Sequence, residues 1–224
     1  MKKRIIGLST MFLTIFLVSS PVFGETYQYY ETVEGEESYE SRWIIEEVAG
    51  MVKLSIETDE EENQYNCVMT PEGAVLEFSM YKPVRKTDFF AQREGETVKF
   101  YGAVNGRDKT KDFSVKEVPW GQPIPILLKE QFNQTEDGLD FWILDINKIR
   151  PIYLQAKQLE VEEIEVLDKK YSAYKIEVRL QGFLSAFWVS HYWLDTETKD
   201  CLKFEGDFGP GTSKSTMELM QKYE

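Results

Sequence analysis

The chain has 224 residues, and its 39 acidic residues outnumber its 26 lysines and arginines, so the formal net charge is −13. A strongly negative protein repels nucleic acid and anionic lipid head groups at long range, which excludes nucleic-acid binding. One histidine is too few for the usual metal site with two or three histidine ligands.

The first 24 residues have the pattern of a secretory signal peptide. A basic start, Lys2-Lys3-Arg4, precedes an apolar run over 5–18, and Gly24 offers the small residue that a signal peptidase requires. The apolar run is short for a membrane-spanning helix, which needs about 20 residues, so we expect cleavage rather than an uncleaved anchor. Cleavage removes three cations and no acidic residue, which leaves a mature chain, 25–224, with a net charge of −16. We expect this chain to be periplasmic, or alternatively secreted, with no transmembrane segment.

The mature chain is predicted to be a single domain built mainly from β-strands. Apolar and polar residues alternate along many short runs, and successive side chains of a strand point to opposite faces of a sheet. The clearest runs cover 52–57, 74–80, 98–102 and 175–180. Turn signals separate them, of which Asn105-Gly106 is the strongest because both central positions of a type I′ turn need a positive φ. Short strands joined in this way predict an antiparallel meander.

One segment breaks the alternation and predicts a helix. Pro125 suits the first turn of a helix, where the missing N–H costs nothing, and Leu128 and Phe132 have i,i+4 spacing. We expect one short helix at about 124–133, docked on the sheet.

The run over 158–167 predicts an irregular strand. Leu159 and Val161 share one phase of the alternation, whereas Ile164 and Val166 share the other. A slip of phase within a strand indicates a β-bulge or a sharp bend, which would help the sheet to curl.

Motifs for catalysis are scarce. The chain has no G-x-S-x-G elbow, phosphate-binding glycine loop or H-E-x-x-H pattern. Ser190 and His191 are neighbours on a predicted strand and point to opposite faces, so they do not form a nucleophile–base pair. The acidic residues of 195–200 lack the spacing of a calcium loop and are interpreted as a hairpin turn. We predict a non-enzyme with no catalytic residues, metal or cofactor.

Aromatic residues carry the clearest signal for a binding function. The chain has 5 Trp, 12 Tyr and 14 Phe, and both phases of the strand over 185–194 carry them. Two interpretations remain open: a large conventional core under the helix, or a cavity for an apolar ligand on the concave side of the sheet. The candidate ligand-binding residues, chosen as aromatics on strands, are Phe78, Phe100, Trp142, Trp188 and Tyr192.

The order of parts resembles a known group of proteins. A signal peptide precedes a meander, one mid-chain helix, longer strands and a last hairpin with Trp193-Leu194-Asp195, then Leu202-Lys203-Phe204-Glu205 and Gly209. This arrangement resembles the half-barrel proteins of the bacterial cell envelope related to the lipoprotein carriers LolA and LolB. The resemblance implies a curved, open antiparallel sheet and an envelope location, and it transfers no catalytic residues. The chain departs from the pattern at Cys201, because the group carries a late proline in its last strand pair.

Three functions follow as hypotheses. The leading one is an exported, non-enzymatic envelope protein that binds a lipid or another apolar ligand in the concave face. The alternative is a structural or protein-interaction module with a self-filled core, which would bind an envelope protein partner through an edge strand or a loop. A hydrolase of envelope polymers rests only on the abundance of carboxylates.

The two cysteines are predicted to remain unpaired. A disulfide needs Cα atoms about 4.4–6.8 Å apart, whereas adjacent strands lie about 4.8 Å apart. If sequence order is spatial order, as in a meander, several strands separate Cys67 from Cys201. Only closure or strong curling of the sheet would bring them together.

Overall fold

The computed structural model describes residues 24–59, 62–132, 138–182, 185, 187–209 and 212–223. The predicted signal peptide, except for Gly24, lies outside the described residues.

The described chain forms fourteen strands and one α-helix. The first eight strands are β1 (Gly24–Val33), β2 (Tyr39–Val48), β3 (Met51–Thr58), β4 (Gln64–Met69), β5 (Val75–Lys82), β6 (Thr87–Glu94), β7 (Thr97–Val104) and β8 (Arg107–Ser114). The helix α1 (Ile124–Gln131) and the last six strands follow: β9 (Leu139–Asp145), β10 (Arg150–Val166), β11 (Lys169–Leu180), β12 (Val189–Asp195), β13 (Cys201–Asp207) and β14 (Lys214–Tyr223).

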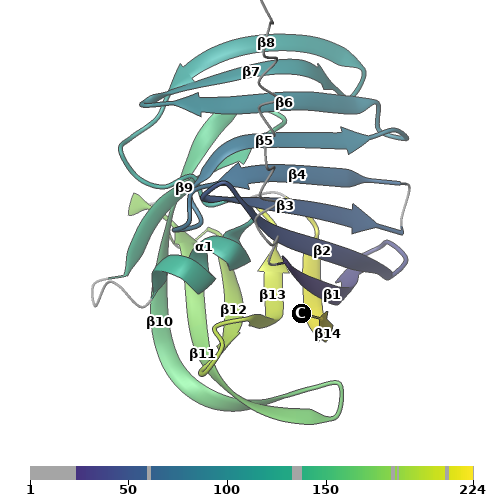
Figure 1. The fold of residues 1–224 in the computed structure, drawn as a ribbon, viewed down its shortest axis with the longest axis vertical. Coiled ribbons are helices and arrows are strands. Elements are labelled where there is room, and N and C mark those ends of the chain that lie inside the picture. Colours follow the sequence, from purple (N-terminus) through teal and green to yellow (C-terminus); the bar gives the residue numbers. More distant parts are fainter. Residues whose placement is uncertain are drawn as a thin grey trace, which may run out of the picture.

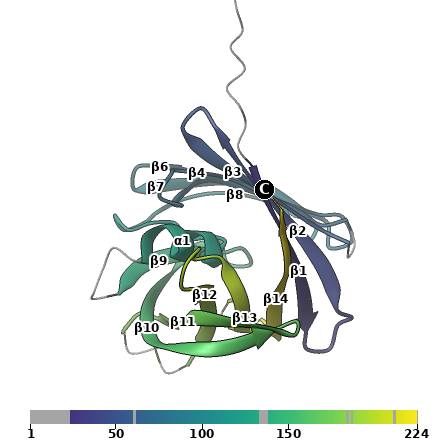
Figure 2. The same ribbon diagram turned by 60° about the horizontal axis from the view of Figure 1, so that its bottom comes forward.

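All fourteen strands belong to one antiparallel sheet. Its order is β8-β7-β6-β5-β4-β3-β2-β1-β14-β13-β12-β11-β10-β9, so β8 and β9 form its two edges and it does not close into a barrel. Figure 1 shows the first half of the sheet above the second half, and Figure 2 shows the second half curling beneath α1. The predicted class, a curved and open antiparallel sheet with one short helix, is confirmed.

The strand order differs from the single uninterrupted meander in which sequence order is spatial order. Each strand pairs with its sequence neighbour except at the break between β8 and β9, and the first strand pairs with the last, from Thr26↔Tyr223 to Val33↔Ser215. The chain is therefore two meanders joined through β1 and β14. Alternation within each strand indicates which face is buried, but it does not indicate which distant strand is the partner.

Local turn chemistry explains the hairpins. Asn105 and Gly106 have φ values of 51° and 71°, which confirms the predicted type I′ turn between β7 and β8. The turn between β10 and β11 uses Leu167 and Asp168, at φ 49° and 64°. The predicted hairpin loop over 195–200 joins β12 to β13.

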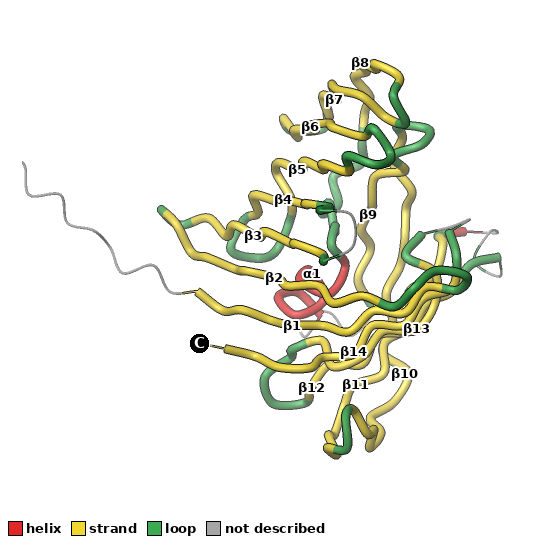
Figure 3. Tube along the Cα trace, turned by 90° about the vertical axis from the view of Figure 1, so that its right-hand side faces the viewer, coloured by secondary structure: helices red, strands yellow, loops and turns green. Residues whose placement is uncertain are grey.

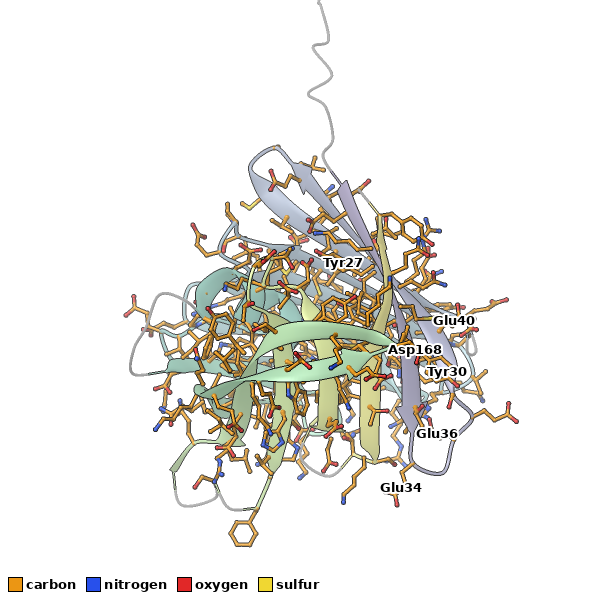
Figure 4. The ribbon with its side chains drawn as sticks, turned by 90° about the horizontal axis from the view of Figure 1, so that it is seen from below. Tyr27, Tyr30, Glu34, Glu36, Glu40 and Asp168 are labelled. Atoms are coloured by element: carbon orange, nitrogen blue, oxygen red, sulfur yellow. The ribbon has the colours of Figure 1, made fainter. Side chains whose placement is uncertain are left out.

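A bulge bends the long β10–β11 hairpin. The pairing register shifts between Gln158 and Glu160, so the predicted irregularity is present and leaves Leu159 unpaired. The β10 strand of this hairpin contacts β14. A small second core forms on the face of the sheet opposite the main core. Trp193 belongs to it because Trp193 alternates along β12 with Tyr192 and Leu194, which face the main core. This second core consists of Val166, Ala173, Trp193 and Leu202. Figure 4 shows the hairpin in front, with Asp168 at its tip.

Helix α1 lies inside the curve of the sheet (Figure 3). Its first five residues, Ile124 to Leu128, are all buried, and Phe132 caps its end, which confirms the predicted helix except at position 133, which lies outside the described residues. The segment before the helix lies against β9: the amide of Trp142 donates to Pro119, and the amide of Gly121 donates to Trp142. Gly121 permits this approach, because a Cβ there would lie 2.4 Å from Leu127 and 2.7 Å from Phe141.

Cys67 and Cys201 are both free and both 3% exposed, as predicted. Their strands, β4 and β13, are separated in the sheet by β3, β2, β1 and β14. The intervening strands are fewer than an uninterrupted meander would place there, because β1 pairs with β14. Burial raises the pKa of both thiols, which suppresses the thiolate.

We expect two free thiols per chain when the unreduced protein is labelled in denaturant, and slow labelling of both in the native protein because both are buried. Mass spectrometry after alkylation measures both quantities. A mass that shows one Cys67–Cys201 bond would contradict the strand order.

Candidate functional site

A cavity of about 600 Å³ lies inside the curve of the sheet. Its volume is in the range of small-molecule binding sites, about 300–1,000 Å³. One wall comes from β1 to β5, the other from β9, β10, β12 and β14, and the start of α1 contributes Ile124 and Pro125. The apolar side chains that line it include Trp43, Ile56, Tyr65, Cys67, Phe78, Met80, Ile143, Leu144, Tyr192, Phe208 and Met217.

Strand register arranges these apolar side chains in rows across the first wall. Trp43 pairs with Ile56, which in turn pairs with Tyr65, and the next inward row contains Cys67 opposite Phe78. Because inward positions recur every second residue, each row lies about 7 Å along the strands from the next. The interior of the cavity is therefore continuously apolar along this wall.

One step toward the strand ends, the lining becomes polar. We call this set the polar collar: Glu31, Tyr39, Thr58, Asn63 and Ser215. Glu31 is 5% exposed, accepts a hydrogen bond from the Tyr39 hydroxyl at 2.9 Å, and accepts another from the hydroxyl of Ser41, just behind the collar. Figure 4 shows Tyr30 and Glu40, which alternate with Glu31 and Ser41, on the outer side of the same strands. The cavity thus has an apolar interior and a hydrogen-bonding collar.

Charged side chains surround the collar. Arg85 lies 3.5 Å from Glu36 in an exposed ion pair, and the Lys82 ammonium lies 5.0 Å from the centre of the Tyr65 ring. Asp145 also lines the cavity, at the end of β9. A cavity lined mainly by apolar side chains with a few polar groups is typical of small-molecule binding sites.

The five predicted ligand-binding residues do not share one site. Phe78 and Tyr192 line the cavity. Phe100 and Trp142 are fully buried in the main core, where Phe100 stacks on Phe89 and Trp142 stacks on Trp120. Trp188 lines a separate, shallow depression with Phe187 and His191. The structure therefore brings together only two of the five.

Most of the lining was missed from the sequence, although part of its signal was present. Alternation over 52–57 marks Ile56 as inward, and alternation over 74–80 marks Phe78 and Met80. The choice of aromatic residues alone passed over Ile56, Met80 and the polar Asn63. The opposite wall, with Ile143 and Met217, depends on strand pairing that alternation does not reveal.

A cluster of charges fixes α1 against the sheet. The Lys129 ammonium lies 2.8 Å from Glu25, 2.9 Å from Asp200 and 2.7 Å from the Tyr27 hydroxyl. Lys222 adds contacts of 2.7 Å to Glu25 and 3.2 Å to Asp200. The Lys129 cluster therefore joins the helix to β1, to β14 and to the β12–β13 loop.

Its pKa shifts follow from burial and pairing. Burial raises the pKa of Glu25, but hydrogen bonds from Lys129, Lys222 and Tyr27 outweigh this effect and lower the pKa to about 2. For Asp200, burial likewise raises the pKa, but the charge and hydrogen bond of Lys129, the hydrogen bond from Tyr27 and the charge of Lys222 together outweigh it, so the pKa is lowered. Burial raises the pKa of Tyr27 far above its usual value, and the hydrogen bonds of its hydroxyl to Glu25 and Asp200 raise this pKa further. Both carboxylates therefore stay ionised in the folded protein near neutral pH.

Ser190, His191 and Asp195, which the sequence analysis considered for catalysis or calcium binding, make contacts that stabilise the fold. Ser190 is fully buried and its hydroxyl donates to the carbonyl of Asp207 at 2.9 Å, while His191 lies 3.7 Å from Glu177 on the other face. Asp195 accepts hydrogen bonds from the amides of Glu197 and Thr198, which is a turn contact. Within the described ranges no group of three His, Cys, Asp or Glu residues is placed to hold a metal ion. The described part of the chain also contains no helix with the length and apolar character to cross a membrane.

Comparisons of sequence identify no relative: no family model matches the chain, and no curated protein matches it. Comparison of structures identifies similar folds. A beta-barrel-like protein of a domain of unknown function, DUF1849, from Brucella abortus superposes with a TM-score of 0.58 at 10% identity, over 89% of this chain and 96% of that one.

Two more solved structures overlap less closely. They are the hypothetical lipoprotein YmcC from Escherichia coli, with a TM-score of 0.45 at 12% identity over 87% of each chain, and a LolA superfamily protein from Nitrosomonas europaea, with a TM-score of 0.30 at 10% identity over 90% of this chain and 84% of that one. The half-barrel fold that the sequence predicted is similar to that of the Brucella abortus protein. At these identities the likeness concerns the fold alone.

Replacement of Lys129 by Met should lower the free energy of unfolding by about 2 kcal/mol, because Asp200 is 6% exposed and would lose one of its two cations. Urea denaturation measures the change. The matched control is Lys170→Met, whose ion pair with Glu163 is two-thirds exposed and should contribute less than about 0.5 kcal/mol. Equal losses in the two variants would contradict the structural role of the cluster.

The stability of the protein should fall steeply between about pH 4.5 and pH 2. Glu25 and Asp200 have lower pKa values folded than unfolded, so their contribution is complete above the unfolded pKa and is lost as the pH falls through the folded pKa. Thermal unfolding across this range measures the effect, and Lys129→Met should show a shallower slope. A slope that is unchanged in the variant would show that other carboxylates are responsible.

Proposed function

We propose that this protein is an exported, non-enzymatic carrier or receptor of the bacterial cell envelope that binds an amphiphilic, largely apolar molecule in its cavity. The observation that carries the proposal is the cavity of about 600 Å³, with its apolar rows and polar collar. A site of this size accommodates an acyl chain or a compact lipid.

The export pattern and the fold likeness support the envelope location. Residues 2–24 have the basic, apolar and small-residue segments of a signal peptide. One solved structure with a similar fold is described as a hypothetical lipoprotein and another as a LolA superfamily protein. These descriptions agree with a location in the cell envelope and with an apolar ligand. For this chain both remain proposals.

The alternative, a module whose core fills itself, has partial support. Helix α1 lies on the concave side of the sheet (Figure 2), and the stacked pairs Phe89–Phe100 and Trp120–Trp142 belong to the main core. The space that remains lies between the helix start and the collar, and it favours ligand binding over a completely filled core. A protein partner on an edge strand or a loop is compatible with an occupied cavity, but no surface of the described residues favours such a partner as specifically as the cavity favours a ligand.

We expect the protein isolated from its native envelope to carry a bound lipid in native mass spectrometry, and to bind a fluorescent apolar probe once stripped. Ile56→Trp should weaken probe binding by at least about 10-fold, because the indole would occupy the cavity next to Trp43.

The matched control is Val161→Trp, since Val161 is 51% exposed on β10 and does not line the cavity. Circular dichroism establishes that both variants fold. The proposal fails if no lipid co-purifies and no probe binds, or if a folded Ile56→Trp binds the probe as well as the wild type does.

A further inference from the structure

The cavity opens at one end of the sheet. The exposed members of its described lining are Glu36, Arg85, Asn147, Phe208, Thr212 and Ser213. They belong to the β1–β2, β5–β6, β9–β10 and β13–β14 turns. Because every pair of neighbouring strands in the sheet is antiparallel, these four turns lie at the same end of their strands. We call this end the mouth of the cavity.

Positive charge gathers on one side of the mouth. The β7–β8 turn contacts the β5–β6 turn, since the Gly106 amide donates to the Lys86 carbonyl at 2.8 Å. The Lys109 ammonium of β8 donates to the Asn147 carbonyl at 3.1 Å, so β8 lies beside the β9–β10 turn. We call the cations that these contacts bring together the basic rim: Arg85, Lys86, Arg107, Lys109, Lys111, Lys148 and Arg150.

Only part of this charge is neutralised by carboxylates. Arg85 pairs with Glu36 at 3.5 Å, and Arg150 pairs with Asp145 at 3.4 Å. Three other cations of the basic rim are exposed and form no ion pair with a described residue: Lys86, Arg107 and Lys148. The basic rim therefore offers free positive charge to an anionic surface.

The carboxylates of β8 point away from the basic rim. Lys109 is on the same phase of the strand as Phe113, which packs against the main core, so its side chain starts on the inner face. Asp108 and Asp112 are on the other phase and face outward. Alternation thus separates the positive and negative side chains of this edge strand onto opposite faces.

An exposed apolar side chain accompanies the cations. Val84 is 65% exposed and directly precedes Arg85 and Lys86 in the β5–β6 turn. At the surface of a bilayer, such a side chain enters the head-group layer while neighbouring cations contact the lipid phosphates. A soluble acidic partner would use the cations alone, so the combination favours a membrane.

The negative net charge of the protein is compatible with this contact. The predicted mature chain has a net charge of −16 and repels an anionic surface at long range. At physiological salt, charges more than about 8–10 Å away are largely screened, so the local cations dominate once the surfaces meet. The β1–β2 turn carries Glu34 and Glu36 at the mouth (Figure 4), and repulsion there would tilt that turn away from the bilayer.

We propose that the basic rim and Val84 dock the protein on membranes that contain anionic lipid, with the mouth of the cavity next to the bilayer. The inference goes beyond the proposed function. It rests on that function only in one respect, namely that docking would bring the cavity to the lipid that it collects or delivers.

The test measures sedimentation of the protein, purified from its native envelope, with lipid vesicles. The wild type should bind vesicles of phosphatidylcholine with phosphatidylglycerol, should not bind pure phosphatidylcholine, and should be released by added sodium chloride. The triple variant Lys86→Gln, Arg107→Gln and Lys148→Gln should bind the anionic vesicles at least about 10-fold more weakly, because each cation near such a surface strengthens binding about 5-fold.

The matched control is the triple variant Arg42→Gln, Lys53→Gln and Lys169→Gln, which removes the same charge from exposed cations outside the basic rim. It should bind the anionic vesicles within about 2-fold of the wild type. No substituted residue of either variant lines the cavity, so both should fold by circular dichroism and bind the fluorescent apolar probe as the wild type does.

Equal losses in the two triple variants would overturn the inference, and so would a wild type that binds neither kind of vesicle or binds both equally. Binding of soluble poly-glutamate through the basic rim, without binding of vesicles, would also overturn it and would assign the basic rim to an acidic protein partner. Because probe binding is measured separately, failure to bind vesicles leaves the proposed function intact, whereas vesicle binding without probe binding contradicts the proposed function alone.

Discussion

The pairing of β1 with β14 is the constraint on which the rest of the structure depends. Through it, strands at the two ends of the sequence lie side by side, and two short meanders become one sheet of fourteen strands. The pairing also places Met217 opposite Glu31, so that both walls of the cavity meet in one continuous surface. The Lys129 cluster has the same origin, because Glu25 comes from β1 and Lys222 from β14.

Helix α1 divides the concave side into a filled part and an open part. Its buried residues, Ile124 to Leu128, belong to the main core, whereas Lys129 lies outside the core and pairs with Glu25 of β1. A helix of eight residues is too short to be stable alone, so its position is a product of these tertiary contacts. Ile124 and Pro125, at the start of the helix, line the cavity, so the position of the helix sets one boundary of the cavity.

The sequence predicted the elements better than their arrangement. The alternation in β3, β5, β7 and β11, the Asn105-Gly106 turn and the helix near Pro125 follow from local chemistry, and each is present. Pairing between Thr26 and Tyr223 depends on which distant edges meet, and local periodicity contains no such information. Strand phase placed Phe78 and Tyr192 correctly on the inner face, yet Phe100 and Trp142, which are equally inward, pack against Phe89 and Trp120 instead of lining a cavity.

The break between β8 and β9 gives the chain an unusual relation between connectivity and shape. If β14 were connected directly to β1 and the chain opened before α1, every strand would follow its spatial neighbour, with no change in any pairing. The protein is thus a circular permutation of a simple up-and-down meander. In the present order every ladder except one joins strands that are neighbours in the sequence. The β1–β14 ladder alone closes a loop of nearly the whole described chain, so its formation carries the largest loop-closure cost of the fold.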